Sequence, residues 1–406
     1  MNSGKVHAHA KDDIKNLRKS ASSSPVVFAI AALCALSLGG LGAQAQTIGM
    51  QAQIPAAEYS ALLDLYQATD GSNWKNNSGW LDPQASAWYG VGVSGGHVIG
   101  LGLQQNGLGG SLPESLGGLM ELLSVQLYGN HLGGSIPAGI GNLSKLQVLG
   151  LYDNQLNGSI PATLGNLSQL QYIAAFDNQL TGSVPESLGN LTNLQFFEFH
   201  DNQLGGSIPA TLGNLHQLTY LDLYENQLTG SIPESLGNLS DLNYFNIFHN
   251  QVSGQIPNSL AALPFLLELG LGENLLSGDV PEFRSMGALD ADISSNYFNI
   301  APGSKSLANI MNSWTDYAAL IFYQPQSAVP GPTLGPIHLL ADGAAQVAVA
   351  GLPGVPYITQ ASTDLTNWVT LGSVTLTNWT GQFLDPSATN YARRFYRALN
   401  PPAATN

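Results

Sequence analysis

A repeat of 24 residues is the feature that most constrains the fold of this chain. Asparagines recur at this interval from Asn106 to Asn274, and Asn296 follows after 22 residues. A fixed period of this size is typical of a solenoid, in which each coil buries its apolar edge only against neighbouring coils. The sequence therefore predicts an elongated stack of coils over residues 98–300.

The repeat unit itself has a distinctive pattern. Around Asn154 it reads LGLYDNQLNGSIP over residues 149–161, followed by LGNL over 164–167. This pattern resembles the plant-type leucine-rich repeat, LxxLxLxxNxLxGxIPxxLGxL. The resemblance implies an α/β repeat solenoid of about nine coils, a horseshoe or right-handed superhelix with a parallel β-sheet on its concave face, and we expect the repeated asparagine to form a buried ladder that bonds backbone groups of adjacent turns.

The charge balance restricts the possible partners. The chain has 12 basic and 27 acidic residues, a formal net charge of −15. Nucleic acid and anionic membrane surfaces are excluded as expected partners, because binding either of them requires clustered Lys and Arg.

The first 45 residues have the pattern of a signal peptide. A basic stretch from Lys5 to Lys19 precedes an apolar run, Val26–Leu38, and Ala43-Gln44-Ala45 fits a cleavage site. Cleavage would remove five basic and two acidic residues, leaving a net charge of −18, and would also remove Cys34, the one cysteine. We therefore expect a secreted, extracellular protein without disulfides, with cell-surface association as a variant and without membrane insertion after cleavage. A single membrane-anchoring helix is the alternative.

Residues 46–97 are predicted to cap the first coil. Apolar residues at helical spacing predict a helix over 55–69, and Trp74, Trp80 and Trp88 follow it. The segment resembles the N-terminal cap of secreted leucine-rich-repeat proteins, with Ser86 and Val93 where that family has cysteines, so tryptophan packing is expected to replace a disulfide. Residues 90–96 match both GxGxxG and GxSxG, but they lack the following helix that either motif needs, and we interpret them as a turn.

The C-terminal third changes pattern after the last coil. We predict a terminal cap over 301–323, a Pro-rich linker over 324–336, a small all-β sandwich over 337–399 and a tail over 400–406. The run YITQASTDLTNWVTLGSVT followed by RRFYRA resembles a small C-terminal module of secreted, multidomain proteins from environmental bacteria. The resemblance implies a bacterial source.

Two aromatic columns are predicted on the concave face. Positions three, five and seven of each unit alternate with the inward-facing positions four and six, so their side chains point away from the core. Position seven holds Gln104, Tyr128, Tyr152, Phe176, His200, Tyr224, Phe248 and Gly272. Position three holds Gly100, Ser124, Val148, Tyr172, Phe196, Tyr220, Tyr244 and Glu268.

Acidic residues flank these columns. Position eight supplies Asp153, Asp177, Asp201 and Glu225, and position five supplies Glu198 and Asp222. Exposed Tyr-rich patches are favoured at interfaces, and the predicted ligand is apolar or basic. The candidate binding residues are Tyr128, Tyr152, Tyr172, Phe176, Phe196, Glu198, His200, Tyr220, Asp222, Tyr224, Tyr244 and Phe248. The alternative is that the rings only stabilise the sheet and the acids only keep the protein soluble.

The predicted function is that of a secreted, non-catalytic binding protein for a protein or peptide ligand. Carbohydrate or surface binding is the alternative, and a hydrolase inhibitor or an enzyme ranks below both. No catalytic residue, cofactor or metal site is predicted, since His200 has no second histidine in the two aromatic columns and the Asp column lacks a DxDxDG-type loop for Ca²⁺. We expect a monomer.

Overall fold

The computed structural model describes residues 54–82, 87–283, 290–293, 296–298, 333–340, 344–350, 356–364, 366–375, 380–390 and 394–399. The predicted signal peptide, the predicted cap over 301–323 and the tail lie outside these residues. So does most of the predicted linker. Among the helices that the structure describes, none combines the length and the apolar character needed to cross a bilayer.

The N-terminal cap is a helix and a hairpin closed by aromatic rings. Helix α4 (Ala56–Ala68) is followed by a short 3-10 turn, η1 (Gly71–Asn73), close to the predicted bounds. Trp80 lies at the centre of an aromatic cluster: its ring centroid is 4.9 Å from that of Trp74, 4.7 Å from that of Trp88 and 5.6 Å from that of Tyr66. All three tryptophans are buried. Tryptophan packing thus closes the cap, as predicted.

A hairpin joins this cap to the first coil. Strand β1 (Val91–Ser94) pairs antiparallel with β2 (His97–Gly102), so residues 90–96 include a strand as well as the predicted turn. Gly95 and Gly96, both with positive φ, make the turn. Because no helix follows β1, neither phosphate binding nor a nucleophile elbow has its required context.

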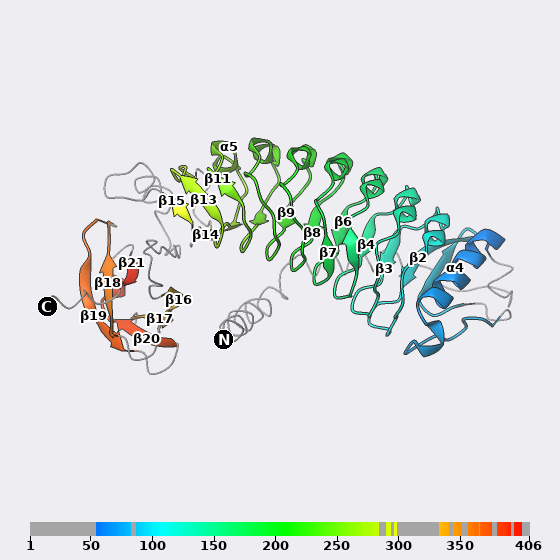
Figure 1. The fold of residues 1–406 in the computed structure, drawn as a ribbon, viewed down its shortest axis with the longest axis horizontal. Helices are drawn as coiled ribbons and strands as arrows, with labels where there is room; N and C mark the ends of the chain where they lie inside the picture. The colour runs from blue at the N-terminus through cyan, green and yellow to red at the C-terminus, as the bar shows by residue number, and fades with distance from the viewer. Residues whose placement is uncertain are drawn as a thin grey trace.

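The main sheet runs the length of the stack and contains ten strands (Figure 1). After β2 come β3 (Ser124–Gln126), β4 (Val148–Gly150), β6 (Tyr172–Ala174), β8 (Phe196–Glu198), β9 (Tyr220–Asp222), β10 (Tyr244–Asn246), β12 (Glu268–Gly270) and β14 (Asp290–Asp292). These strands pair in parallel, and each residue lies beside its equivalent in the next repeat, as Tyr220 does beside Tyr244. The predicted parallel sheet is confirmed.

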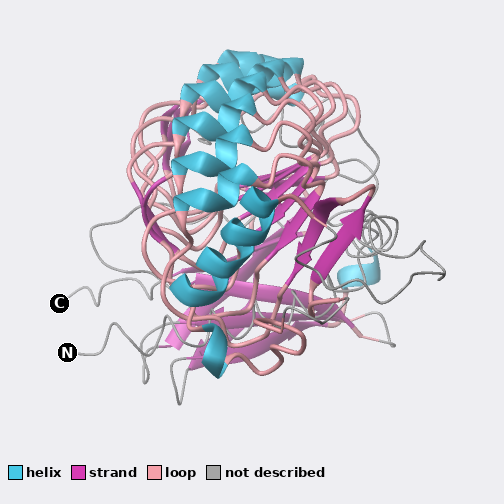
Figure 2. Cartoon of the chain, turned by 90° about the vertical axis from the view of Figure 1, so that its right-hand side faces the viewer, coloured by secondary structure: helices cyan, strands magenta, loops and turns pink. Residues whose placement is uncertain are grey.

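The opposite side of the stack is built from short 3-10 helices (Figure 2). They are η2 (Glu114–Gly118), η3 (Ala138–Asn142), η4 (Ala162–Asn166), η5 (Glu186–Asn190), η6 (Ala210–Asn214), η7 (Glu234–Asn238) and a final α-helical turn, α5 (Asn258–Ala261). A proline precedes each one at the N-cap. Its fixed φ suits the entry into a tight turn.

Between these two sides, short strands pair along a third edge of the coils. They are β5 (Asn157–Ser159) with β7 (Gln179–Thr181), and β11 (Ser253–Gly254) with β13 (Leu275–Gly278) and β15 (Tyr297–Phe298). Isolated bridges such as Ser183 with Gly205 continue the pattern in other coils.

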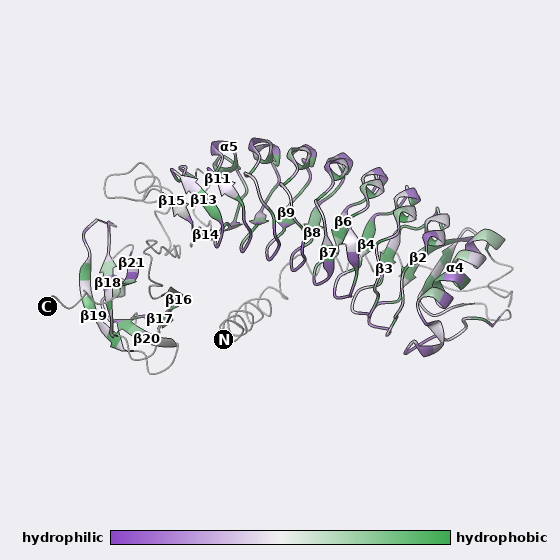
Figure 3. Ribbon diagram, viewed as in Figure 1, coloured by the Kyte–Doolittle hydropathy of each residue, from purple (hydrophilic) through white to green (hydrophobic). Residues whose placement is uncertain are grey.

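One continuous core fills the interior of the coils. Hydrophobic residues recur on the strands of successive coils (Figure 3). The leucines at positions one, four, six and eleven are buried, as predicted from their spacing, for example Leu146, Leu149, Leu151 and Leu156. Ala175 and Phe199, neighbours in the position-six column, are both buried, which fits a small residue making room for a large one.

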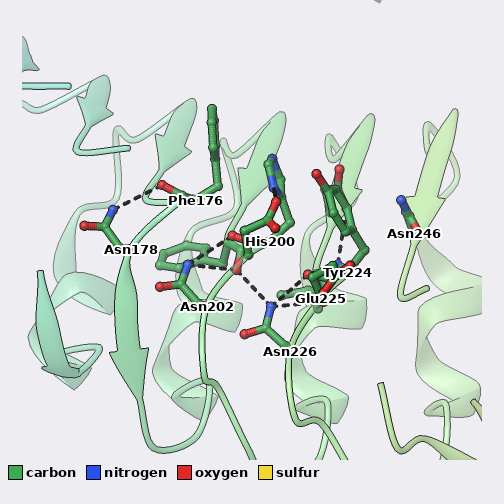
Figure 4. A network of polar contacts seen from close by, with 12 residues as sticks. Phe176, Asn178, His200, Asn202, Tyr224, Glu225, Asn226 and Asn246 are labelled. Carbon is green, nitrogen blue, oxygen red and sulfur yellow. Dashed lines mark hydrogen bonds and ion pairs between the residues drawn. The ribbon is translucent and has the colours of Figure 1, made fainter. Parts of the chain in front are cut away.

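The repeated asparagines form the predicted ladder between coils (Figure 4). The amide of Asn226 donates to the carbonyls of Phe199 on the preceding coil at 3.0 Å and of Leu223 on its own coil at 3.1 Å. Its Oδ1 accepts a hydrogen bond from the Leu204 N–H at 2.9 Å. The same pattern extends to Asn296, whose Oδ1 bonds the Leu276 N–H at 2.9 Å, so the ladder runs to the last described coil.

The C-terminal strands form two antiparallel sheets of three strands each. One sheet has the order β16 (Thr333–Leu339), β17 (Ala345–Ala350), β20 (Thr380–Asp385), and the other has β19 (Val369–Thr375), β18 (Pro356–Ser362), β21 (Phe395–Leu399). A short 3-10 turn, η8 (Ala388–Asn390), lies between β20 and β21. Strands β17, β18, β19 and β21 match predicted runs. The sequence reading missed β16, whose first four residues fall in the predicted linker, and β20.

Candidate functional site: the concave face

The concave face is the outer surface of the main sheet over its middle coils. Strand alternation places Phe197 and Leu221 in the core and turns their neighbours, Phe196, Glu198, Tyr220 and Asp222, away from it. All twelve predicted candidates come from equivalent positions on β3 to β10 or the residues just after them. The parallel register therefore lines them up in columns.

Position seven forms a continuous stack of five rings. Tyr128, Tyr152, Phe176, His200 and Tyr224 follow one another with centroids 4.3 to 4.5 Å apart and interplanar angles of 8 to 15°. Phe176, His200 and Tyr224 stand side by side above the asparagine ladder in Figure 4. The faces of the inner rings are covered by their neighbours. These rings therefore present their edges to a ligand.

Position three is less regular. Tyr220 stacks on Tyr244 at 4.1 Å and 9°, whereas Phe196 lies tilted to Tyr172 and to Tyr220 at centroid distances of 6.0 and 6.3 Å. Val148, Tyr172, Ala174 and Phe196 form a small apolar cluster of their own, separate from the main core. The concave side of the sheet thus carries a second apolar layer.

This layer buries part of the predicted face. Tyr172, Phe196, His200 and Tyr224 are 8% exposed or less, and Tyr128, Tyr152, Phe176, Tyr220, Tyr244 and Phe248 are half-buried. Ring stacking contributes about 0.5–1.5 kcal/mol per pair. The two aromatic columns therefore stabilise the sheet, as the alternative interpretation of these rings expects. The half-buried rings are the ones that a ligand can reach.

Two carboxyls lie between the aromatic columns. Glu198 and Asp222 are neighbours in the β8–β9 register, with exposures of only 9% and 2%. The Tyr220 hydroxyl donates to Asp222 Oδ2 at 3.3 Å, and the Tyr224 N–H lies 3.4 Å from its Oδ1. Glu198 Oε1, in contrast, is buried without a hydrogen-bond partner among the described residues.

Burial perturbs the protonation of both groups. Desolvation raises the pKa of Glu198 to about 7 and that of Asp222 to about 7, and the nearby His200 only partly offsets it. Burial also acts to lower the pKa of His200, but Asp222, Asp201 and Glu198 together outweigh it, and the net shift is upward. The centre of the face thus holds two carboxyls with a pKa of about 7 beside a histidine whose pKa is raised. The sequence placed these titratable residues on the concave face but did not predict that they are buried.

The position-eight acids have a structural role that the sequence reading missed. Asp153, Asp177, Asp201 and Glu225 all have φ between 50 and 55°, in the left-handed region. Asp and Asn tolerate this conformation better than most residues, and Gly129 fills the same place one coil earlier. A glycine at position eight of one repeat was the sequence signal that this position needs a positive φ. The backbone therefore accounts for part of the acidic column.

Within the described part of the chain, no three His, Cys, Asp or Glu side chains are placed to hold a metal ion. His200 Nδ1 lies 3.0 Å from Asp201 Oδ2, while His249, which faces Glu225 and Glu273, belongs to another column. What the face combines is apolar area, ring edges and buried carboxyls.

Comparison with known proteins supports the fold. Residues 101–253 match a family model described as a leucine-rich repeat region. No match was found among curated proteins.

Solved structures give the same result. The structure of PEPR1–AtPEP1 has 31% identity and a TM-score of 0.56, and the match covers 66% of this chain and 38% of that one. The ectodomain of the plant membrane receptor kinase GASSHO1/SCHENGEN3 from Arabidopsis thaliana, in complex with CASPARIAN STRIP INTEGRITY FACTOR 2, has 32% identity and a TM-score of 0.50, covering 64% and 32%.

The Arabidopsis receptor kinase HAESA, solved with the peptide hormone IDA and the co-receptor SERK1, has 26% identity and a TM-score of 0.53, covering 66% and 46%. The chain thus spans less than half the length of each of these three structures. The matched segment, the 24-residue coil geometry and these neighbours together show that the chain folds as a leucine-rich-repeat solenoid followed by additional antiparallel strands.

Proposed function

We propose that this chain is a secreted, non-catalytic protein that binds a peptide or a segment of a protein on its concave face. The observation that carries the proposal is the second apolar layer over β4 to β9, on a face that has six half-buried aromatic rings in all. A layer of this kind on the outside of a sheet is unusual for a surface that contacts only water. The HAESA structure, which contains a peptide hormone, supports the ligand class.

The ring geometry favours a peptide over a glycan. Sugars bind aromatic residues by stacking on exposed ring faces, and the faces of Tyr152, Phe176 and His200 are covered on both sides by their neighbours in the column. Ring edges suit the side chains and carbonyls of an extended peptide, because the edge of an aromatic ring is electropositive.

The test is selection of ligands from a displayed peptide library, with the full chain as bait and a glycan array in parallel. Phe176→Ala with Phe248→Ala should reduce binding of selected peptides at least about tenfold, because two reachable rings are lost. Tyr89→Ala, which removes an exposed ring on the N-terminal cap, is the control and should bind normally. The double variant must retain the wild-type circular dichroism. Peptides that bind it as they bind wild type, or a glycan signal without peptide binders, would refute the proposal.

A further inference from the structure

The centre of the concave face holds more negative charge than its surroundings balance. Burial has the largest effect on the pKa of the Glu198 and Asp222 carboxyls, and the side chains that act on one or both of them are His200, Asp222 itself (on Glu198), Tyr172, Tyr220, Tyr244 and Asp201. Of these, only His200 can carry a positive charge. One imidazolium therefore faces two buried carboxyls and Asp201, while Glu198 Oε1 has no hydrogen-bond donor among the described residues.

Among the described residues of the solenoid, no further lysine or arginine is free to balance this charge. Residues 98–300 contain two basic residues, Lys145 and Arg284, against 17 acidic ones. The Lys145 ammonium lies 2.5 Å from Glu121 Oε2 on the preceding coil and is thus already paired. Arg284 lies outside the described residues. The described residues thus leave the charge at the face centre to be balanced by a ligand.

The surroundings fit an organic cation better than a metal ion. No metal-ligand cluster exists among the described residues, and the carboxyls lie between two columns of aromatic rings rather than in a ring of oxygens. A guanidinium is weakly hydrated and tolerates aromatic surfaces, and a lysine ammonium carries the same charge. Such a group need not touch Glu198 Oε1, because charges attract strongly across a layer of low dielectric constant.

We propose that the peptide ligand carries arginine or lysine and docks that cationic side chain over Glu198 and Asp222. The inference rests on the proposed function and specifies its ligand. The half-buried ring of Tyr220 is stacked on Tyr244 but only tilted against Phe196, so one face is not covered by stacking; it lies on the strand that carries Asp222 and offers π-surface to the same cation.

The titration of the carboxyls supports this assignment. Because burial holds the pKa of Glu198 at about 7 and that of Asp222 at about 7, each is largely neutral at pH 6 and ionised at pH 8. A bound cation favours the ionised forms, so its affinity should rise across this range. Carboxyls of ordinary pKa, in contrast, do not titrate in this range.

Fluorescence polarisation with labelled hexa-arginine, and with hexa-citrulline as its neutral isostere, tests the proposal on the full chain at low salt. Hexa-arginine should bind several-fold more tightly at about pH 8 than at about pH 6, and hexa-citrulline should bind weakly at both. Glu198→Gln with Asp222→Asn should weaken hexa-arginine binding about tenfold and remove most of the pH dependence. Asp64→Asn, on the exposed side of α4, removes one negative charge far from the face and should change nothing.

Equal binding of hexa-arginine by wild type and the Glu198/Asp222 variant would overturn the proposal, as would no binding by wild type. Equal binding of the two probes, lost in the Phe176/Phe248 variant, would overturn it while leaving the proposed peptide-binding function intact. Peptides selected from the library should also contain arginine or lysine. A selected set without basic residues would contradict the inference in the same way.

Discussion

Burial of Glu198 and Asp222 gives the middle coils a dependence on pH that exposed acids would not. Each carboxyl binds its proton more tightly in the folded chain than in the unfolded chain, because desolvation penalises the ionised form. The stabilising contribution is therefore fully present below the unfolded pKa and is lost as pH rises through about 7. This direction is the reverse of the one expected for a salt-bridged surface carboxylate.

Glu198→Gln should accordingly stabilise the protein at alkaline pH. A rise of the Glu198 pKa from 4.5 to about 7 corresponds to roughly 3 kcal/mol of lost stability once the group is ionised. Chemical denaturation should show the variant more stable than wild type by about 2 kcal/mol at pH 8, with a much smaller difference near pH 5. Glu114→Gln, which alters an exposed carboxylate on η2, is the control and should show no such pH-dependent gain. The same stability difference at both pH values would mean that Glu198 is not the titrating group.

At the scale of single coils and the links between them, the sequence predicted the features that recur in every coil. It did not predict the features that depend on which side chains lie next to one another in adjacent coils. The asparagine ladder, the leucine core and the parallel register all follow from a 24-residue period, because each coil repeats the same contacts. Ring stacking along position seven and the burial of Tyr172, Phe196, His200 and Tyr224 depend on how adjacent side chains settle. Strand β20 was missed because it lacks a clear alternation of apolar and polar residues.

Asn226 should contribute far more to the free energy of unfolding than an exposed asparagine does. Asn226→Ala leaves the buried Leu204 N–H without its acceptor, which costs about 1–3 kcal/mol, and removes one of the two asparagine bonds that the Phe199 and Leu223 carbonyls each accept. We expect a loss of about 3 kcal/mol in denaturant unfolding. Asn193→Ala, which removes one exposed bond to the Ser168 carbonyl, is the matched control and should cost about 0.5 kcal/mol or less. Similar losses for the two variants would show that the ladder does not link the coils energetically.

At the scale of the whole molecule, the solenoid makes stability a sum of local terms. Each coil contacts only the next, so a defect at one end loosens the coils beside it without directly touching distant ones. The N-terminal cap is where this matters most, because the aromatic cluster around Trp80 covers the open end of the first coil. We therefore expect the cap to unfold locally without unfolding the coils that form the concave face.

Trp80→Ala tests this separation. Removing a buried tryptophan from the cluster should cost about 3–5 kcal/mol locally, since a large cavity opens beside Trp74, Trp88 and Tyr66. Hydrogen exchange should accelerate over residues 97–130, next to the cap, while the amides of β9 and β10 keep their protection. Trp368→Ala removes a ring in the C-terminal strands, where Arg397 lies over it, and should leave exchange in the solenoid unchanged. A uniform loss of protection from β2 to β12 in the Trp80 variant would instead show that the coils unfold as one cooperative unit, and binding on the concave face would then depend on the cap.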